Sequence, residues 1–86
     1  MNTTENVQKN KIIVYGTESC SYCHLLKDYL KEKSFEYEYV DVGVDASAAQ
    51  MIREKSGQRG VPVSDIDGHI VVGYDVEKVN ELLNIK

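Results

Sequence analysis

The spacing of apolar side chains changes several times along the chain, and each change indicates a new element. Residues 11–16, KIIVYG, form a continuous run of mostly β-branched and aromatic side chains, which is typical of a buried strand. Over residues 21–33 apolar side chains recur at helical spacing, and charged side chains occupy the opposite face. Residues 35–42 then alternate with a period of two, which predicts a strand, and we expect its aromatic side chains to belong to the core.

The second half of the chain predicts two further helices. Residues 45–57 contain good helix formers and end at a glycine, and either Asp45 or Ser47 can cap the start of the helix. Residues 75–86 return to helical spacing of apolar side chains, and Asp75 stands at the position of an N-cap. Both segments are therefore expected to be amphipathic helices that cover a sheet.

Between these helices, residues 61–75 predict two short strands joined by a turn at Asp67-Gly68, which is a strong hairpin signal. The element order is then β-α-β-α-β-β-α. It predicts an α/β fold, a four-stranded mixed sheet with three helices, whose first two strands are parallel and whose last two are antiparallel. We expect this domain to span 11–86, after a flexible N-terminal lead-in at 1–10.

The composition is that of one soluble domain. A chain of 86 residues has no room for a second core, and 42% hydrophobic with 28% charged residues is ordinary for a globular protein. No apolar run approaches the roughly 20 residues of a membrane helix, and the first residues show no secretory signal, so we expect a cytoplasmic protein. A net charge of −4 argues against nucleic-acid binding, and we expect a monomer.

The two cysteines, Cys20 and Cys23, are separated by two residues, and three kinds of site could use them. Tetrahedral zinc requires four ligands, but the usual second pair of cysteines is absent, His24 directly follows Cys23, and His69 lies far along the chain. We therefore expect no metal. A structural disulfide that closes so short a loop would add little stability. In a reducing cytosol the pair is better explained as a redox centre.

A redox pair needs one exposed thiol that ionises readily and a second thiol close enough to attack the mixed disulfide. Cys20 precedes the first predicted helix, where unpaired backbone N–H groups and the helix dipole favour a thiolate. Cys23 lies one turn further in, so we expect Cys20 to attack the substrate and Cys23 to resolve the mixed disulfide. His24 is expected to be a solvated helix-surface side chain rather than a general base.

Three short motifs occur in an order that resembles a known family. Residues 20–23, CSYC, resemble Cys-Pro-Tyr-Cys; residues 60–63, GVPV, resemble a Thr-Val-Pro loop; and residues 73–75, GYD, resemble the Gly-x-Asp that follows the last strand. Together they are similar to the glutaredoxins and glutaredoxin-like proteins of the thioredoxin superfamily, over residues 11–83. The resemblance implies a thioredoxin-like fold and a dithiol oxidoreductase.

The resemblance also implies which residues form the site. Thr17, Ser21, Tyr22 and Pro62 would form the active-site loop, with Pro62 in the cis form and facing the sulfurs. Glutathione, as co-substrate, would pair with the Val61 backbone like an added strand. The implied glutathione-binding residues are Tyr22, Arg59, Val61, Pro62, Gly73, Tyr74 and Asp75.

Several positions depart from the family's pattern. Thr17 stands where glutaredoxins often carry a lysine that contacts a glutathione carboxylate. Without this lysine, glutathione should bind more weakly and the thiolate should be less stable, unless Arg59 supplies the contact. Asp75 can cap the last helix, contact glutathione, or do both. Ser64 and Asp65 lie in a strand that is usually apolar in the family, and we expect Asp65 to reach the surface because a buried carboxylate is costly.

The sequence therefore favours a glutathione-linked thiol–disulfide oxidoreductase that reduces protein disulfides and glutathione mixed disulfides through Cys20 and Cys23. One alternative is a glutaredoxin-like electron donor recharged by thioredoxin reductase, which Thr17 favours and Asp75 opposes. An alternative of another class is an iron–sulfur cluster carrier, in which Cys20 of two chains and two glutathiones hold the cluster; Tyr22 and Cys23 oppose it. The expected partners are thus glutathione, disulfide-containing proteins and, in the first alternative, thioredoxin reductase.

Overall fold

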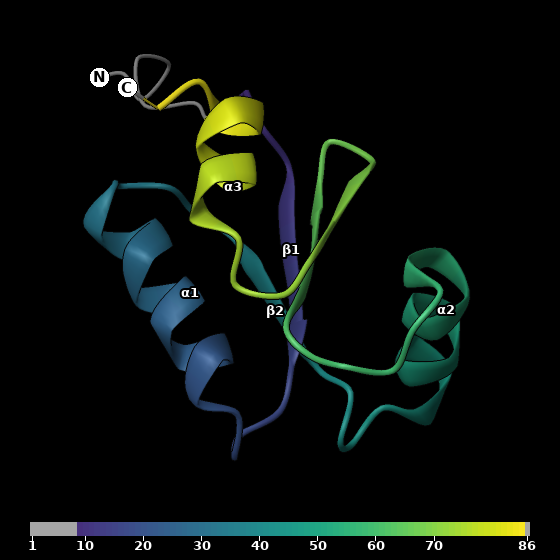
Figure 1. The fold of residues 1–86 in the computed structure, drawn as a ribbon. Coiled ribbons are helices and arrows are strands. Elements are labelled where there is room, and N and C mark those ends of the chain that lie inside the picture. Colours follow the sequence, from purple (N-terminus) through teal and green to yellow (C-terminus); the bar gives the residue numbers. More distant parts are fainter. Residues whose placement is uncertain (1–8, 86) are drawn as a thin grey trace.

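A computed structural model describes residues 9–85 and contains the predicted mixed sheet and three helices (Figure 1). The strands lie in the order β2-β1-β3-β4, with β1 and β2 parallel and the other two pairs antiparallel. Residues 1–8 of the expected lead-in lie outside the described residues. The elements in chain order are β1 (Ile12–Gly16), α1 (Ser21–Glu32), β2 (Glu38–Asp41), α2 (Ala46–Ser56), β3 (Val63–Ile66), β4 (His69–Val72) and α3 (Val76–Leu83).

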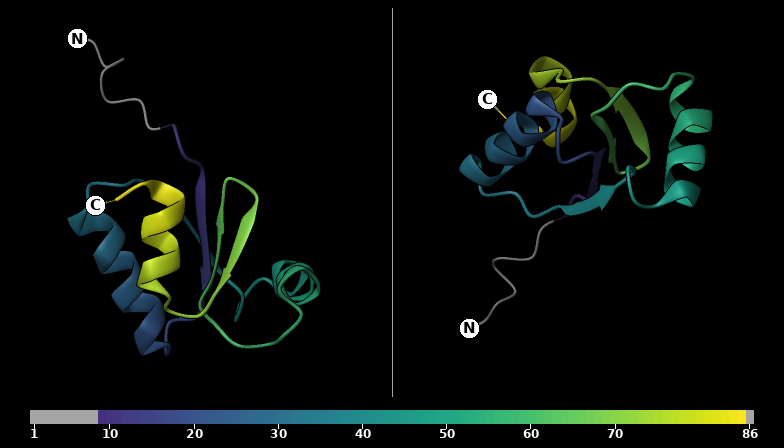
Figure 2. Two further views of the ribbon diagram at one scale, coloured as in Figure 1. Left: turned by 45° about the horizontal axis from the view of Figure 1, so that its top comes forward. Right: turned by 90° about the horizontal axis from the view of Figure 1, so that it is seen from below.

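The helices cover both faces of the sheet, with α1 and α3 on one face and α2 on the other (Figure 2). Successive side chains of a strand point to opposite faces, so Val14 belongs to the α1/α3 side and Tyr15 to the α2 side. The larger core consists of Ile12, Val14, Leu26, Leu30, Ile66, Val71, Val79 and Leu83. The smaller core consists of Tyr15, Ile52 and Val63.

The caps predicted for the second and third helices are confirmed. Asp45 begins α2 by accepting a hydrogen bond from the Ala48 N–H at 3.0 Å, and Gly57 ends it with a φ of 73°. Asp75 caps α3 in the same way, because its Oδ1 accepts the Lys78 N–H at 3.1 Å. These short-range contacts fix where each helix begins and ends.

The hairpin turn is also confirmed, and it holds the start of β1. Asp67 and Gly68 have φ values of 54° and 90°, the two positive values that a two-residue hairpin turn favours. One Asp67 carboxylate oxygen accepts the Lys11 N–H at 2.8 Å and the other accepts the Asn10 amide at 2.6 Å. These hydrogen bonds lower the pKa of Asp67. The turn therefore joins the hairpin to the first strand of the sheet.

The strand predicted at 35–42 is shorter in the structure, where β2 covers only four residues. The reason lies at the end of α1: Ser34 has a φ of 66°, and the Phe35 N–H donates to the Leu30 carbonyl at 2.9 Å. The chain is therefore still completing the end of α1 where the alternation predicted a strand. The aromatic side chains of this segment do pack against the larger core, as predicted.

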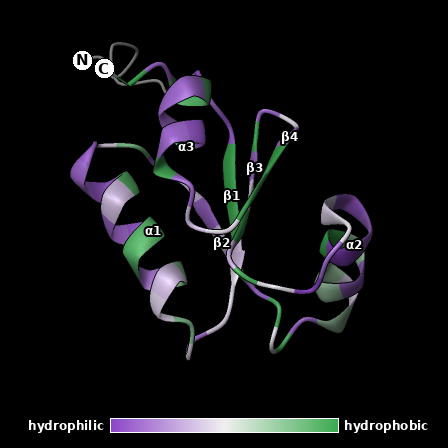
Figure 3. Cartoon of the chain, viewed as in Figure 1, coloured by the Kyte–Doolittle hydropathy of each residue, from purple (hydrophilic) through white to green (hydrophobic). Residues whose placement is uncertain are grey.

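The hydropathy of the chain follows this layering. Hydrophobic positions concentrate on the central strands, whereas the helices combine hydrophobic with hydrophilic positions (Figure 3). Within residues 9–85, no helix has both the length and the apolar character needed to cross a membrane. This hydropathy is what we expect of helices that pack on the two faces of a sheet and also contact solvent.

The two polar residues of β3 have different environments. Ser64 is 1% exposed, and its hydroxyl has no hydrogen-bond partner among residues 9–85. It pairs in register with Val14 and Val71, so it lies in a row of core residues. Asp65 is half-buried, and its carboxylate reaches the exposed hairpin turn, where it accepts the Gly68 N–H at 2.8 Å. The turn therefore accounts for Asp65, while Ser64 is an unsatisfied polar group in the core.

We expect Ser64→Ala to raise the free energy of unfolding by about 1 kcal/mol, because it removes a buried hydroxyl that forms no hydrogen bond. The measurement is urea unfolding followed by circular dichroism. Ser56→Ala is the matched control: its hydroxyl donates to the Gln58 carbonyl at 3.0 Å, so the same substitution should destabilise by about 0.5–1.5 kcal/mol. A loss of stability in both variants would contradict the prediction.

Candidate active site

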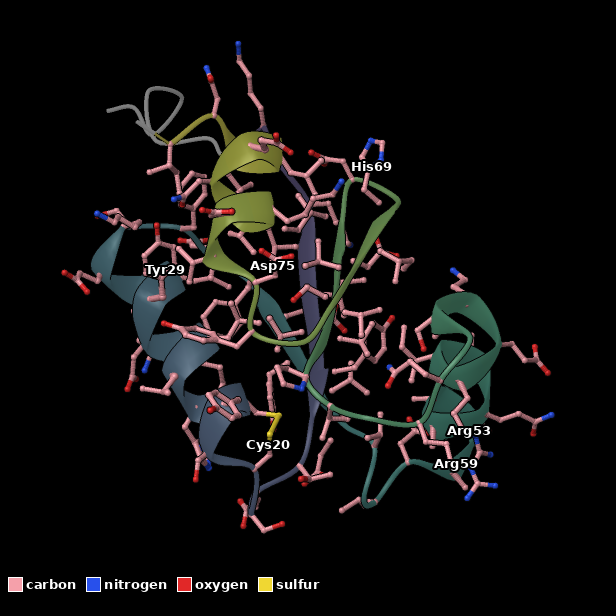
Figure 4. All side chains as sticks on the ribbon, in the orientation of Figure 1. Cys20, Tyr29, Arg53, Arg59, His69 and Asp75 are labelled. Carbon is pink, nitrogen blue, oxygen red and sulfur yellow. A yellow bond between two sulfur atoms is a disulfide. The ribbon has the colours of Figure 1, made fainter. Side chains whose placement is uncertain are left out.

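Cys20 and Cys23 lie where the carboxyl end of β1 meets the start of α1, and their sulfurs are joined in a disulfide (Figure 4). Their Cα atoms are 5.2 Å apart. Cys20 is half-buried, whereas Cys23 has 0% of its surface exposed. The structure thus has the asymmetry that the sequence predicted, with one accessible sulfur and one enclosed sulfur.

Cys20 is the N-cap residue of α1, and its sulfur takes part in the cap. Its Sγ accepts the backbone N–H of Cys23, with 3.1 Å between nitrogen and sulfur. The unpaired N–H groups of a helix N-terminus and the positive end of its dipole stabilise a negative charge placed there. Once the disulfide is reduced, the backbone at this position favours the thiolate of Cys20.

Gly16, the last residue of β1, leaves the space that the buried sulfur occupies. A methyl group at this position would lie 2.5 Å from Cys23 Sγ and 2.9 Å from Cys23 Cβ. Contacts this short do not occur between real carbon and sulfur atoms, so only a residue without a side chain fits. From the sequence alone, Gly16 is expected only to end the first strand. The signal for its second role is a glycine in a strand that runs directly into the cysteine motif.

The loop before β3 lies beside Cys20, as the resemblance implied. The Val61–Pro62 peptide bond is cis, and the Val61 carbonyl oxygen lies 3.8 Å from Cys20 Sγ. The Gly73 N–H donates to the Pro62 carbonyl at 2.8 Å, so the segment after β4 is held against the same loop. Two regions that are far apart in the sequence therefore meet around the accessible sulfur: the connection from β1 to α1, and the loops around Pro62 and Gly73.

Two tyrosines form an exposed aromatic surface at this site, which we call the aromatic rim. Tyr22 and Tyr74 stack with ring centroids 5.9 Å apart and an angle of 27° between the planes. Their side chains are 59% and 38% exposed. The large exposed side chains of Leu25 and Val72 belong to the same two segments of chain, one on α1 and one at the end of β4. Such a surface offers apolar contact area to a partner.

The side chains predicted to contact a glutathione carboxylate are less well placed. Thr17 is half-buried and uncharged, and Arg59 is exposed on the α2 side of the molecule, apart from Cys20 (Figure 4). The Gln58 amide is engaged within its own loop, because it donates to the Gly60 carbonyl at 3.0 Å and accepts the Gly60 N–H at 2.6 Å. The exposed carboxylate of Asp75 caps α3 through one oxygen.

The two histidines do not join the cysteines in a metal site. His24 is exposed, as predicted, but its ring also donates from Nε2 to the Glu18 carbonyl at 2.6 Å, which ties α1 to the loop before Cys20. His69 lies at the hairpin turn, at the opposite end of the sheet from Cys20 (Figure 4). Residues 9–85 contain no group of three or more histidine, cysteine or acidic side chains that could hold a metal ion.

Comparison with known proteins supports a redox centre at this site. The glutaredoxin family model matches residues 12–71. A glutaredoxin-like 8.6 kDa protein from the rubredoxin operon of Clostridium pasteurianum is 38% identical over 84% of this chain and 96% of its own length. A thioredoxin-like protein of known crystal structure has 36% sequence identity to this chain. The two structures superpose with a TM-score of 0.82 over 87% of this chain and 96% of that one. The NrdH-redoxin of Escherichia coli, a glutaredoxin-like protein with a thioredoxin-like activity profile, is 26% identical, with a TM-score of 0.77 over 84% of this chain and 93% of that one.

We expect Gly16→Ala to lower the free energy of unfolding by about 1–3 kcal/mol, because the added methyl group would displace Cys23 from its enclosed position. Urea unfolding of the oxidised protein measures the change. Gly43→Ala is the control, since the nearest atom to its added methyl group is a side-chain oxygen of Asp41 at 3.1 Å; it should change stability by less than about 0.5 kcal/mol. Equal losses in both variants would contradict the role given to Gly16.

Proposed function

This chain belongs to the glutaredoxin family of thiol–disulfide oxidoreductases, and we therefore propose that it reduces disulfides by a dithiol mechanism through Cys20 and Cys23. The observation that carries the proposal is the unequal environment of the two sulfurs. Cys20 is accessible and caps the N-terminus of α1, whereas Cys23 is enclosed against Gly16. A substrate can reach the first sulfur and not the second.

The first step is attack by the Cys20 thiolate on one sulfur of a substrate disulfide. A bond forms between Cys20 and that sulfur, the substrate S–S bond breaks, and the other substrate sulfur leaves as a thiolate that takes a proton from water. In the second step Cys23 loses its proton to water and attacks Cys20 Sγ. The remaining substrate sulfur leaves and is protonated, and the two cysteines are left oxidised while the substrate has gained two electrons.

The electron donor that reduces the pair again is, in our proposal, a flavoprotein of the thioredoxin reductase type. Glutathione carries two carboxylates, and the candidate side chains are poorly suited to bind them. Thr17 is uncharged, the Gln58 amide is already hydrogen-bonded to Gly60, and Arg59 lies apart from Cys20. The aromatic rim, by contrast, suits a protein partner, because tyrosine is enriched in protein interfaces. The likeness to an NrdH-redoxin with a thioredoxin-like activity profile supports the same donor.

Glutathione is the second candidate for the donor, and two observations favour it. The Val61 backbone lies beside Cys20, where it can pair with the backbone of a bound thiol peptide. One oxygen of Asp75 caps α3, which leaves the other for an ammonium group. In either case disulfide-containing proteins and mixed disulfides with glutathione are the proposed substrates.

A paired assay separates the two donors. NADPH oxidation is followed with a protein disulfide as substrate, once with thioredoxin reductase and once with glutathione and glutathione reductase. We expect turnover at least about tenfold faster with thioredoxin reductase, because a missing hydrogen-bonded contact to a glutathione carboxylate costs about 1.5 kcal/mol or more of binding. Faster turnover with glutathione would contradict the proposed donor, though not the dithiol mechanism.

A variant of position 17 sharpens this comparison. Thr17→Lys adds a cation near the sulfur, and Thr17→Gln adds length without charge. One exposed ion pair contributes about 0.3–1 kcal/mol, so the lysine variant should gain about twofold to fivefold in glutathione-dependent turnover, whereas the glutamine variant should not. Neither variant should raise turnover with thioredoxin reductase.

The roles of the two cysteines are tested by serine substitution. Cys20→Ser should abolish all activity, because it removes the attacking sulfur. Cys23→Ser should lose the reduction of protein disulfides, accumulate a mixed disulfide at Cys20 that mass spectrometry detects, and retain some reduction of glutathione mixed disulfides. An active Cys20→Ser variant beside an inactive Cys23→Ser variant would reverse the assignment.

A further inference from the structure

Tyr39, on β2, carries a buried hydroxyl group close to the sulfur of Cys23. Tyr39 pairs in register with Val14, so its ring lies on the α1 side of the sheet. Its hydroxyl oxygen is buried and has no hydrogen-bond partner among residues 9–85. A methyl group built on Gly16 would lie 3.0 Å from this oxygen and 2.5 Å from Cys23 Sγ. The hydroxyl and the sulfur therefore border the same small space.

An unpaired buried hydroxyl is unfavourable, and most such groups in folded proteins have a partner. The sulfur of Cys23, which borders the same space as the Tyr39 hydroxyl, changes its capacity to accept a hydrogen bond during the reaction. In the disulfide this sulfur is a weak acceptor, whereas as a thiolate it carries a full negative charge, and hydrogen bonds to charged groups are the stronger ones. The oxidised protein therefore has a donor in place before its acceptor exists.

The ring of Tyr39 is held in this position from α1. The Lys27 ammonium lies 3.9 Å from the ring centroid, close enough for a cation–π contact. Lys27 follows Cys23 by four residues, so both side chains lie on the same face of the helix. The same helix therefore positions the sulfur and the ring that carries the hydroxyl.

Burial and, to a lesser extent, the groups near Tyr39 keep its hydroxyl protonated. Burial is the largest cause, and Asp41, Glu18 and Tyr37 add to it; together they raise the pKa of Tyr39 above its ordinary value. At neutral pH the phenol is then a hydrogen-bond donor and not a base. Lys27, over the ring, is the nearby positive charge that the structure shows.

We propose that Tyr39 is a positioning residue for the resolving step, in which its hydroxyl donates a hydrogen bond to the sulfur of Cys23 as that sulfur becomes a thiolate. The inference rests on the proposed dithiol mechanism. Cys23 gives up its proton to water, attacks Cys20 Sγ and forms the disulfide, while the departing substrate thiolate gains a proton from water and Tyr39 keeps its own. In the reduced pair the two adjacent thiols titrate together, so Cys23 carries part of the thiolate charge, and the same hydrogen bond stabilises the reduced pair relative to the oxidised pair.

Tyr39→Phe removes the donor and leaves the ring, and Tyr37→Phe is the matched control on the same aromatic segment. We expect Tyr39→Phe to shift the equilibrium of the pair with a dithiothreitol redox buffer by about threefold to tenfold toward the disulfide, which for tenfold is a potential about 30 mV more negative. The closing rate of a preformed mixed disulfide at Cys20, measured by stopped flow, should fall by about tenfold at pH 7. Its pH profile should move to higher pH, while Tyr37→Phe should leave all three unchanged.

Urea unfolding in the two redox states distinguishes this role from packing. Tyr39→Phe should leave the oxidised protein as stable as before, or more stable, and should destabilise the reduced protein. A packing role would move both states equally. A redox equilibrium within twofold of the original, or the same shift in Tyr37→Phe, would overturn the proposal.

The redox equilibrium measures the Cys20–Cys23 bond directly and needs no substrate, so its result stands even if the proposed catalytic roles fail. The unaltered protein supplies a second measurement. The 13Cζ resonance of Tyr39, assigned by its loss in Tyr39→Phe, should shift on reduction more than that of Tyr37. No difference between the two shifts would count against the hydrogen bond.

Discussion

The close contact between Gly16 and Cys23 determines how the first helix meets the sheet. With no side chain at the last residue of β1, the sulfur of Cys23 can approach the strand backbone, and the N-terminus of α1 lies directly over the end of the sheet. Cys23 is thereby enclosed, while Cys20 remains one residue outside the helix, where the cap leaves it accessible. The contact encloses one sulfur, and the cap at the start of α1 gives the other its accessible position.

The backbone, more than any nearby cation, stabilises a thiolate at Cys20. The N–H of Cys23 points at Cys20 Sγ, and the first turn of α1 adds its dipole. The replacement of lysine by Thr17 therefore matters less for the nucleophile than the sequence suggested, because these backbone contacts do not depend on residue 17. Its effect falls on substrate choice, since an anionic thiol finds little positive charge here and an apolar partner finds the aromatic rim.

Features with short-range causes could be predicted from the sequence. The caps at Asp45 and Asp75, the turn at Asp67-Gly68 and the position of Cys20 before α1 each depend on residues within four positions of one another. The predicted start of the second strand was wrong, because α1 ends in a left-handed turn at Ser34. The periodicity of apolar residues carries no information about that turn. The alternation in this segment still identified the core face correctly.

The parts of the site that the sequence could not show depend on contacts across the sheet. The stacking of Tyr22 on Tyr74 and the closeness of Gly16, Cys23 and Tyr39 join residues whose relation appears only after folding. The family pattern supplied the position of Pro62, because that pattern records a long-range contact as a short motif. It gave no signal for Tyr39, which lies outside every motif.

The two unpaired hydroxyls of the core allow one more comparison. Tyr39 and Ser64 flank Val14 in the same row across the sheet, and both oxygens are buried without a partner in residues 9–85. Each therefore destabilises the oxidised fold through the same loss of hydration. Only the Tyr39 hydroxyl borders a sulfur that gains charge during the reaction, so its unfavourable burial is relieved in one redox state. The hydroxyl of Ser64 has no such group beside it in the contacts described, and the redox cycle offers no reason for its presence.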